Sequence, residues 1–360
     1  MKKQLKWYIK NVYKERTMKS AWATGKRKIE LIDEEYPAPG PDEVTVKVKT
    51  CGICGTDLHF YREFPGGEKI PLGHEVSAQV HQTGKMVRDL HPGDRVIVQN
   101  HIPCGRCRAC LQGDPYRCQD IQTYMDDRSA MAEFLKVNRS MLVPFWGLDY
   151  AGASVAEPLT VAFDLIREVE LKPFQQLLIS GLGIIGLFCI RLARIGGAEK
   201  VIALGRHHGT ARGKKRAEEA FACGADRVFD TEDPDWGELL EKEFPVGFHR
   251  IIVTSPPRTI PPLLPLLSFG GTIVYNGISF SETDITFDAN AFHFKKLKLK
   301  ASHAIPNWGF PLALESLARG TIDYRPLVTH TYPFSELLQA FEAAANPDEG
   351  AIKVLVTFED

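Results

Sequence analysis

The hydrophobic pattern of this chain changes character near residue 150. From about residue 26 onward, apolar and polar residues alternate in short segments such as KIELID, EVTVKVKT and VSAQVHQT, with turn-forming stretches such as PAPGPDE between them. Because successive side chains of a strand point to opposite faces, this spacing predicts half-buried strands joined by tight turns. We therefore expect the first 150 residues to form a β-rich, barrel-like body.

After residue 150, short apolar runs alternate with segments of helical period. QQLLISG, KVIALG, DRVFD, HRIIVTS and TIVYNGI resemble buried strands, and IIGLFCIRLARIG and RAEEAFACG between them repeat at helical spacing. Strands that alternate with helices indicate a parallel, doubly wound α/β sheet. The pattern becomes less regular from about residue 300, and AIKVLVTF predicts a closing strand.

Composition and charge limit the possible partners. The 360 residues suffice for two domains with separate cores, and 44% of them are hydrophobic. A net charge of −1 gives no global field that would attract nucleic acid or a membrane surface. The longest apolar run, LLISGLGIIGLFCI, is short and broken by glycines, so no membrane span is expected. Residues 1–17 form a basic extension without the apolar core of a secretory signal. We expect it to be solvated, and the alternative is an amphipathic helix that docks on the body or on a partner.

Four of the eight cysteines lie in CGRCRACLQGDPYRC, as Cys104, Cys107, Cys110 and Cys118. Two-residue gaps let successive thiolates surround one ion, and four sulfurs complete a closed tetrahedral zinc shell. A closed shell leaves no position for substrate, so this zinc should be structural. Clustered thiols of this kind also favour a reducing compartment, and we expect the protein to be cytoplasmic.

A second set of metal-binding groups suits an open site. CGICGTDLHFY, LGHEV and AEPL contribute a thiol, imidazoles, a hydroxyl and carboxylates: Cys54, Thr56, Asp57, His59, His74, Glu75 and Glu157. A soft thiolate together with imidazole and carboxylate suits zinc, and three protein ligands leave a place for a substrate oxygen. Taken alone, His74 has a plainer interpretation as a core histidine, and Glu157 as a charge at a helix start.

The glycines of GLGIIG predict a dinucleotide site. Gly181, Gly183 and Gly186 follow a predicted strand and open a predicted helix, with Ile184 and Ile185 between them. The first glycine permits the tight turn, the second lets a pyrophosphate approach the backbone, and the third lets helix and strand pack closely. The helix N-terminus then supplies amide donors to the phosphates.

The end of the next predicted strand bears on the choice of cofactor. A carboxylate there would accept a hydrogen bond from the 2′-hydroxyl of NAD, but the position is Gly205, followed by Arg206. A guanidinium can bind a 2′-phosphate, so we predict a preference for NADP, with NAD as the alternative. The plainer interpretation of the basic residues that follow is the solvated start of the next helix.

These motifs together resemble the zinc-dependent medium-chain dehydrogenase/reductase family, in its polyol, threonine and glucose dehydrogenase branch. The likeness covers roughly residues 18–360, with CGICGTDLH, GHE, the four-cysteine lobe, AEPL and GLGIIG in the family order. It implies a GroES-like catalytic domain over 18–157 and 301–360 and a Rossmann domain over 158–300. The stretch from Gly205 to Asp226 is longer than the family pattern, which leaves the ribose contacts open.

The resemblance also assigns roles to single residues. Cys54 and His74 match catalytic zinc ligands, Glu157 matches the third protein side chain near the metal, and Glu75 matches a carboxylate that in some members binds the metal directly. Thr56 matches the hydroxyl that bonds the substrate oxygen, His59 the base at the outer end of a proton relay, and Asp57 a residue that orients a ligand.

The implied function is hydride transfer between a secondary alcohol, polyol or sugar hydroxyl and NAD(P)+, with two zinc ions per chain, one catalytic and one structural. The implied partners are a small alcohol, polyol or ketone substrate and further copies of the chain, as a homodimer or homotetramer. Two alternatives stay open at this point. One is a zinc-independent NADPH reductase of the same fold, and the other is a non-catalytic zinc scaffold that binds nucleotide.

Overall fold

The computed structural model describes residues 17–303 and 308–359, and in these ranges the chain forms two compact units. The first contains the described residues up to Glu157, Phe310–Ala345 and the chain from Lys353 onward, and the second contains Pro158–Gly309 and Asn346–Ile352. The first unit thus resumes at Phe310, later than the expected 301. All of the basic extension except Thr17 lies outside the described residues.

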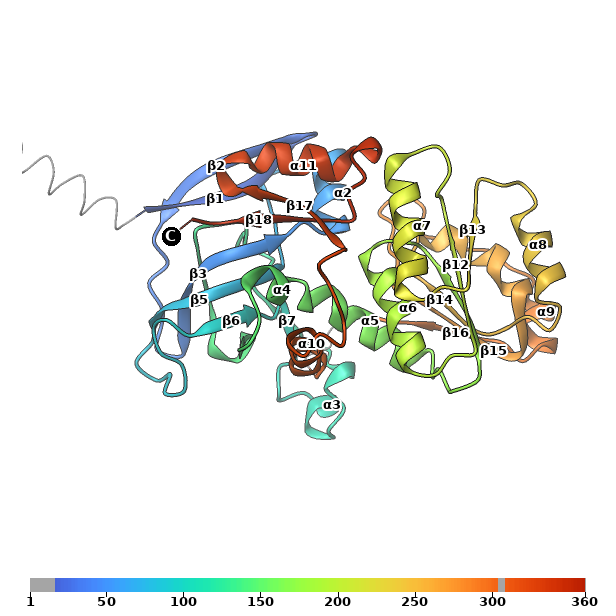
Figure 1. The fold of residues 1–360 in the computed structure, drawn as a ribbon. Helices are drawn as coiled ribbons and strands as arrows, with labels where there is room; N and C mark the ends of the chain where they lie inside the picture. The colour runs from blue at the N-terminus through green and yellow to red at the C-terminus, as the bar shows by residue number, and fades with distance from the viewer. Residues whose placement is uncertain (1–16, 304–307, 360) are drawn as a thin grey trace, which may run out of the picture. The chain divides into compact units, whose positions relative to one another are not determined.

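The first unit is built on antiparallel strands, apart from one parallel pair, β17 with β18 (Figure 1). Its larger sheet has the order β10-β6-β5-β3-β18-β17, with β9 also paired to β3: β3 (Glu43–Gly52), β5 (Glu75–Thr83), β6 (Arg95–Val98), β9 (Phe134–Asn138), β10 (Leu142–Pro144), β17 (Val328–Pro333) and β18 (Lys353–Thr357). A smaller sheet has the order β2-β1-β4: β1 (Thr17–Gly25), β2 (Lys28–Glu35) and β4 (Ile70–Pro71). A hairpin pairs β7 (His101–Ile102) with β8 (Gln122–Thr123).

The predicted alternation is clear in β3. Val44, Val46 and Val48 are fully buried, whereas Lys47 and Lys49 between and beyond them are only half-buried. Near its end the strand is buried at every position from Thr50 to Gly52, and β18 and β5 pair with its two edges there. The β-rich first part is therefore confirmed, and its central strand ends at Gly52, two residues before Cys54.

Short helices connect and flank these strands: α2 (Gly55–Glu63), α3 (Arg108–Leu111), α4 (Tyr150–Ser154), α10 (Gly309–Ala318) and α11 (Leu337–Ala345). The 3-10 turns of this unit are η1 (Pro115–Arg117), η2 (Arg139–Met141) and η5 (Phe334–Glu336). α2 begins where β3 ends, because the Asp57 carboxylate accepts the backbone N–H of Cys54 at 2.9 Å and caps the first turn. A long helix, α5 (Ala156–Glu168), contains Glu157 in its first turn.

The second unit is the predicted doubly wound sheet, with six parallel strands in the order β13-β12-β11-β14-β15-β16. Its strands are β11 (Gln176–Ser180), β12 (Lys200–Gly205), β13 (Arg227–Asp230), β14 (Phe248–Val253), β15 (Leu267–Tyr275) and β16 (Lys298–Ala301). Between them lie α6 (Ile184–Ile195), α7 (Ala211–Cys223), α8 (Trp236–Glu243), α9 (Ala289–Phe294), η3 (Pro257–Thr259) and η4 (Pro261–Leu266), and η6 (Pro347–Glu349) belongs to the same unit. The strand order reverses between β11 and β14, the position at which such sheets bind nucleotides.

Side chains on both faces of this sheet are buried. Leu178, Ile202 and Ile251 pack with Leu240 of α8 and Leu263 of η4 in one cluster. Residues that alternate with them point to the other face, where α6 and α7 lie against the sheet (Figure 1). Burial on both faces explains why these strands are continuous apolar runs.

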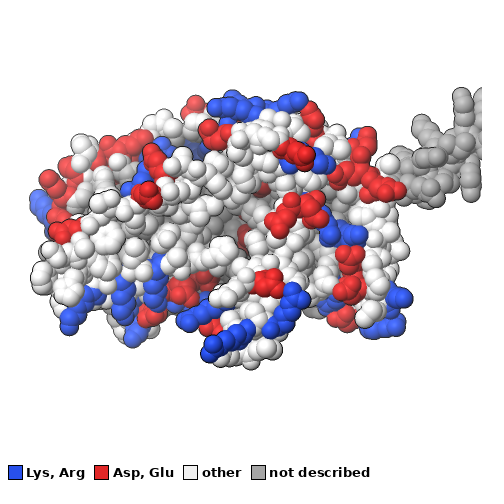
Figure 2. Space-filling view, turned by 180° about the vertical axis from the view of Figure 1, so that it is seen from behind, with Lys and Arg blue, Asp and Glu red and all other residues white. Residues whose placement is uncertain are grey.

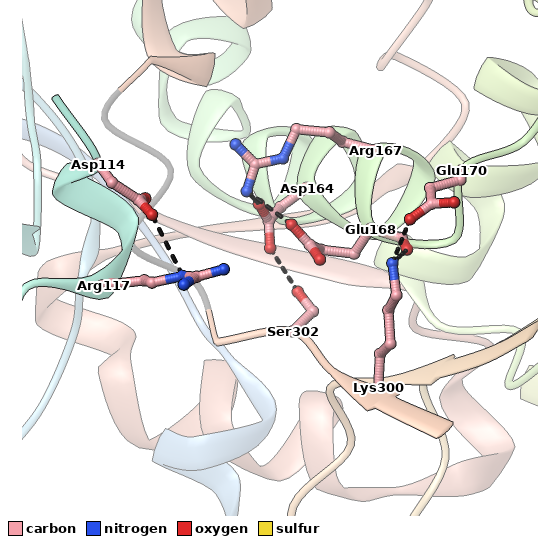
Figure 3. Close-up of polar contacts among 8 residues, drawn as sticks. All are labelled: Asp114, Arg117, Asp164, Arg167, Glu168, Glu170, Lys300 and Ser302. Carbon is pink, nitrogen blue, oxygen red and sulfur yellow. Dashed lines mark hydrogen bonds and ion pairs between the residues drawn. The ribbon is translucent and has the colours of Figure 1, made fainter. Parts of the chain in front are cut away.

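A polar network fastens the C-terminal half of α5 to the end of β16 (Figure 3). The buried carboxylate of Asp164 accepts from Arg167 at 2.8 Å and from the Ser302 hydroxyl at 2.6 Å. Lys300 of β16 donates to the Glu168 carbonyl at 3.0 Å and to the Glu170 carboxylate at 2.5 Å. The sheet edge and the helix that begins this unit are therefore held together by charge as well as by packing.

Acidic and basic side chains both occur over the face shown in Figure 2, with apolar and neutral residues between them. This distribution agrees with the net charge of −1. None of the helices in the described part of the chain is long and apolar enough to cross a membrane.

Candidate metal and cofactor sites

The four-cysteine lobe lies between β7 and β8, so the pairing of these two strands closes it at its base. The sulfurs of Cys104, Cys107, Cys110 and Cys118 all lie within 4.8 Å of one another. Cys107 is 3.5 Å from Cys110 and 3.9 Å from Cys118, sulfur to sulfur. Four zinc–sulfur bonds of about 2.3 Å in a tetrahedron would place the sulfurs about 3.8 Å apart, so the arrangement fits a closed zinc shell.

Backbone groups of the lobe already point at these sulfurs. The amides of Cys107 and Cys104 donate to the sulfurs of Cys104 and Cys118, each at 3.3 Å. Such donors stabilise thiolates, the form that binds metal. An ion pair of 3.2 Å between Arg117 and Asp114 spans the turn η1 of the lobe (Figure 3).

Replacing Cys110 with serine should lower thermal stability before it affects hydride transfer. The change removes one of four thiolates from a shell that leaves no position for substrate, so zinc content should fall by about one equivalent and Tm should drop by several degrees. Metal analysis and thermal unfolding measure both effects. Cys223→Ser is the matched control, since Cys223 lies on α7 outside any cluster of metal-binding groups in the described chain. Unchanged zinc content in Cys110→Ser would contradict the assignment.

The second cluster joins Cys54, His74 and Glu75, whose ligand atoms also lie within 4.8 Å of one another. Cys54 precedes α2, and His74 and Glu75 stand at the start of β5. The pairing of β3 with β5 brings the two segments together, because Gly52 lies opposite Glu75. A side chain at Gly52 would put its Cβ 2.0 Å from the Glu75 carboxylate, so only glycine fits there.

Asp57 holds the two ligand-bearing segments together from a buried position. Its carboxylate accepts the Cys54 amide at 2.9 Å and the Gly73 amide, directly before His74, at 2.8 Å. Burial raises the pKa of Asp57, whereas nearby His74 and these two amides oppose the rise. Its contacts are with the backbone beside the two ligands, which is a way to fix ligand positions without touching the metal.

The Glu75 carboxylate is engaged by a lysine from the far end of the chain. Lys353 Nζ lies 2.6 and 2.7 Å from the two Glu75 oxygens and 3.0 Å from the Ile53 carbonyl, and both side chains are almost fully buried. Little in the sequence indicates this pair. Its one signal is a lysine in the otherwise apolar strand AIKVLVTF.

Glu157 is also buried beside this cluster, and its Oε1 accepts from Asn100 Nδ2 at 3.1 Å. Burial raises the pKa of Glu157 to about 7, against the opposing effect of His74. Among the described residues, the group whose ligand atoms all lie within 4.8 Å contains Glu75 and not Glu157. Thr56 and His59 lie on α2, directly beyond Cys54, and both are half-buried.

The electrostatics of this region favour a bound cation. Burial alone would lower the pKa of His74, but Cys54, Asp57 and Glu157 around it raise that pKa well above its usual value. Lys353 is already paired with Glu75. A thiol and three carboxylates thus share one imidazole and one ammonium group in a buried space, and a divalent ion would balance them.

The glycine motif has the backbone that close approach of a phosphate requires. Gly181 has a φ of 106°, in the region that favours glycine, and Gly183 is the N-cap of α6. A Cβ at Gly186 would lie 1.9 Å from the Gly181 carbonyl oxygen, whereas one at Gly183 would meet nothing within 4 Å. Ile184 is buried and Ile185 half-buried in the first turn of the helix.

Three arginines gather after β12. Arg206 is exposed and directly follows Gly205, while Arg212 and Arg216 lie one turn apart on α7. Burial, together with repulsion from Arg212 and Arg206, lowers the pKa of Arg216 to about 10. Arg212 donates to the Asn346 carbonyl at 2.5 Å. The segment after Gly205 and the start of α7 therefore place three guanidinium groups near one another.

Two zinc-type ligand clusters in a β-rich unit, joined in one chain to a doubly wound nucleotide-binding sheet, define a zinc- and nucleotide-dependent oxidoreductase. Residues 40–146 match the family model of the alcohol dehydrogenase GroES-like domain, and residues 185–318 match that of the zinc-binding dehydrogenases. The chain belongs to the zinc-dependent medium-chain dehydrogenase/reductase family.

Individual relatives agree over nearly the whole chain. L-galactonate-5-dehydrogenase of Escherichia coli K12 is 27% identical over 90% of this chain and 94% of its own length. Sorbitol dehydrogenase of Bacillus subtilis 168 is 27% identical over 94% of this chain and 97% of its own length. A zinc-binding dehydrogenase of Sinorhizobium meliloti 1021, solved bound to NADP, has 28% identity and a TM-score of 0.83, over 95% of this chain and 99% of the other.

Proposed function

We propose that the protein transfers hydride between a secondary hydroxyl of a polyol or sugar-derived substrate and NADP+. The observation that carries the proposal is the cluster of half-buried Cys54, buried His74 and buried acidic side chains, in which acidic groups outnumber basic ones. Relatives named for L-galactonate and sorbitol support a polyhydroxylated substrate. A non-catalytic scaffold would have no need for this second, open cluster beside the closed one.

In this proposal Cys54, His74 and Glu157 would hold the catalytic zinc. Glu75 stays beside it, because both of its oxygens are bonded to Lys353. Bound there, zinc would supply a Lewis acid that makes the substrate hydroxyl more acidic. Thr56 relays the substrate's hydroxyl proton: it accepts that proton as its own hydroxyl proton passes outward toward His59, farther along α2, which exchanges it with solvent.

A substrate panel tests the proposal directly. Reduction of NADP+ and NAD+ is followed with polyols, sugars, simple secondary alcohols and amino alcohols, on protein whose zinc content has been measured. We expect about two zinc ions per chain and turnover with polyols. About one zinc per chain and no turnover with any of these compounds would favour the scaffold. Full turnover after zinc removal would favour a zinc-independent reductase.

The arginines after β12 support NADP as the preferred cofactor. A 2′-phosphate on the adenosine ribose would give Arg206 and Arg216 a doubly charged partner. Arg216 has a buried Nε without a hydrogen-bond partner, and burial with like charges nearby disfavours its charged form. An anion at this position would relieve both costs. Gly183 and the start of α6 would bind the pyrophosphate, with Gly181 forming the turn, Gly186 allowing close packing of helix and strand, and Ile184 and Ile185 in the first turn of the helix.

Replacing Arg206 or Arg216 with alanine should therefore weaken NADP+ selectively. Loss of one charge-assisted hydrogen bond costs about 1.5–3 kcal/mol, so KM for NADP+ should rise about 10- to 100-fold while KM for NAD+ changes little. Lys214→Ala is the matched control, because Lys214 is an exposed cation on the same helix. Equal effects on both cofactors, or a wild-type preference for NAD+, would contradict this assignment.

We also propose that the chain forms a homodimer or homotetramer. β16 is an edge strand of the second unit's sheet, and Phe269 and Phe294 are 69% and 73% exposed. The Lys296 ammonium lies 5.6 Å from the centre of the Phe269 ring. Exposed aromatic side chains on β15, which pairs with this edge strand, and on α9, which precedes it, favour coverage by another chain.

The proposed compartment is the cytoplasm. The two metal clusters need Cys54 and the four lobe cysteines as thiolates, and a reducing environment keeps them so. All eight cysteines are free thiols in the structure.

A further inference from the structure

We propose that the second unit holds a third metal site, for zinc or a similar divalent transition ion, formed by His207, His208 and Asp230. The two histidines follow β12, and Asp230 ends the neighbouring parallel strand β13. Carboxyl ends of adjacent parallel strands lie at the same sheet edge, which brings these side chains together. One ligand atom from each lies within 4.8 Å of the others.

The separations suit a single ion. His208 Nδ1 lies 3.1 Å and His207 Nδ1 3.6 Å from the same oxygen, Asp230 Oδ2. His208 Nδ1 also lies 3.6 Å from Asp233 Oδ1, which offers a fourth ligand. Bonds of about 2.0–2.2 Å in a tetrahedral zinc site put neighbouring ligand atoms about 3.3–3.6 Å apart. Little movement is needed for an ion to enter.

The carboxylate is fixed before any ion arrives. The side chain of Asp230 is fully buried, and its Oδ2 accepts the backbone amides of His207 at 3.1 Å and His208 at 2.5 Å. Its other oxygen accepts the Glu232 amide at 2.9 Å. These bonds hold the backbone of both histidines against the carboxylate, so both rings face one oxygen. Such support of a ligand reduces the entropy lost when metal binds.

The donor set defines the chemistry. Two imidazoles with one or two carboxylates suit zinc, copper or nickel, and are unlike the thiolate-containing clusters of the first unit. The His208 side chain is 60% exposed, so an ion can enter from solvent and keep a water ligand. Arg206 directly precedes the histidines, so a bound ion would also fix the backbone of the segment that carries Arg206.

Metal content tests this site without any measurement of activity. Zinc-loaded protein is titrated with further zinc against a chromophoric chelator, and bound zinc is counted in wild type, His208→Ala and His207→Ala/His208→Ala. We expect wild type to bind one equivalent more than the double variant, and His208→Ala to bind the extra ion at least ten-fold more weakly. His293→Ala is the control, since His293 lies on α9 in the same unit and belongs to none of the described clusters.

A cobalt measurement separates this site from the other two. Cobalt bound at the two cysteine-containing clusters gives thiolate-to-metal charge-transfer absorption, whereas cobalt at His207, His208 and Asp230 gives none. The extra equivalent should therefore bind without adding to that band. Equal zinc counts in wild type and both variants would overturn the proposal and leave His–Asp ion pairs only. These results do not depend on whether the protein oxidises polyols.

Discussion

Replacing Cys54 with serine is expected to abolish alcohol oxidation while leaving NADPH binding nearly intact. A serine hydroxyl is not ionised at neutral pH and is a weak zinc ligand, so the second cluster would lose its only thiolate. Zinc chemistry contributes several kcal/mol of transition-state stabilisation, and each 1.36 kcal/mol is a factor of ten, so kcat/KM should fall by about three orders of magnitude or more. Steady-state kinetics with a polyol and NADP+ measures the loss.

Two further measurements make this experiment decisive. NADPH fluorescence should give a Kd within about two-fold of wild type, because the glycine motif lies in the other unit. Zinc should fall by about one equivalent, with the four-cysteine lobe still loaded. Cys223→Ser should match wild type in all three measurements. Near-normal turnover in Cys54→Ser with the zinc confirmed lost would refute the proposed zinc chemistry.

The sequence predicted the fold well because its local signals agree with one another. Alternation in EVTVKVKT and the apolar runs of the second unit follow from burial on one or both faces of a strand. GLGIIG is equally local, because Gly181 and Gly186 contact each other within one turn. The structure confirms the doubly wound sheet, because the alternation of strand and helix is also a local pattern.

The surroundings of the metal cluster could not be predicted in the same way. Lys353 meets Glu75 only because β3 pairs with β18 on one edge and β5 on the other. Asn100 meets Glu157 from 57 residues away in the sequence. Such pairs depend on strand register, which periodicity does not reveal. The partner of a buried charged side chain is therefore visible only in the structure.

Asp230 shows the same limit in the second unit. In the sequence it ends an ordinary strand, DRVFD, and carries no motif. The structure places its buried carboxylate under the backbone of His207 and His208. We expected the segment after Gly205 to be longer than usual. Its length alone did not indicate that a carboxylate on the neighbouring strand would accept hydrogen bonds from its backbone.

Breaking the pair between Lys353 and Glu75 should cause the largest loss of stability among substitutions outside the metal ligands. Lys353→Met keeps the length and apolar stem of the side chain but removes the ammonium group. The Glu75 carboxylate would then be buried without its cation, and the Ile53 carbonyl would lose a donor. Truncating one partner of a buried ion pair costs about 3–5 kcal/mol, so the free energy of unfolding of the first unit should fall by that amount. Denaturant unfolding of the zinc-loaded protein measures it.

The double variant Glu75→Gln/Lys353→Met distinguishes the loss of the ion pair from the loss of the other contacts that each side chain makes. Most of the cost of the single change comes from the uncompensated charge, so removing both charges should restore much of the lost stability. A double variant whose loss equals the sum of the two single losses would show that the charges do not interact. Activity gives a second readout, because in Lys353→Met the Glu75 carboxylate is free to approach the metal and compete with Glu157. Glu75→Gln/Lys353→Met lacks that carboxylate, so it should retain more activity than Lys353→Met alone.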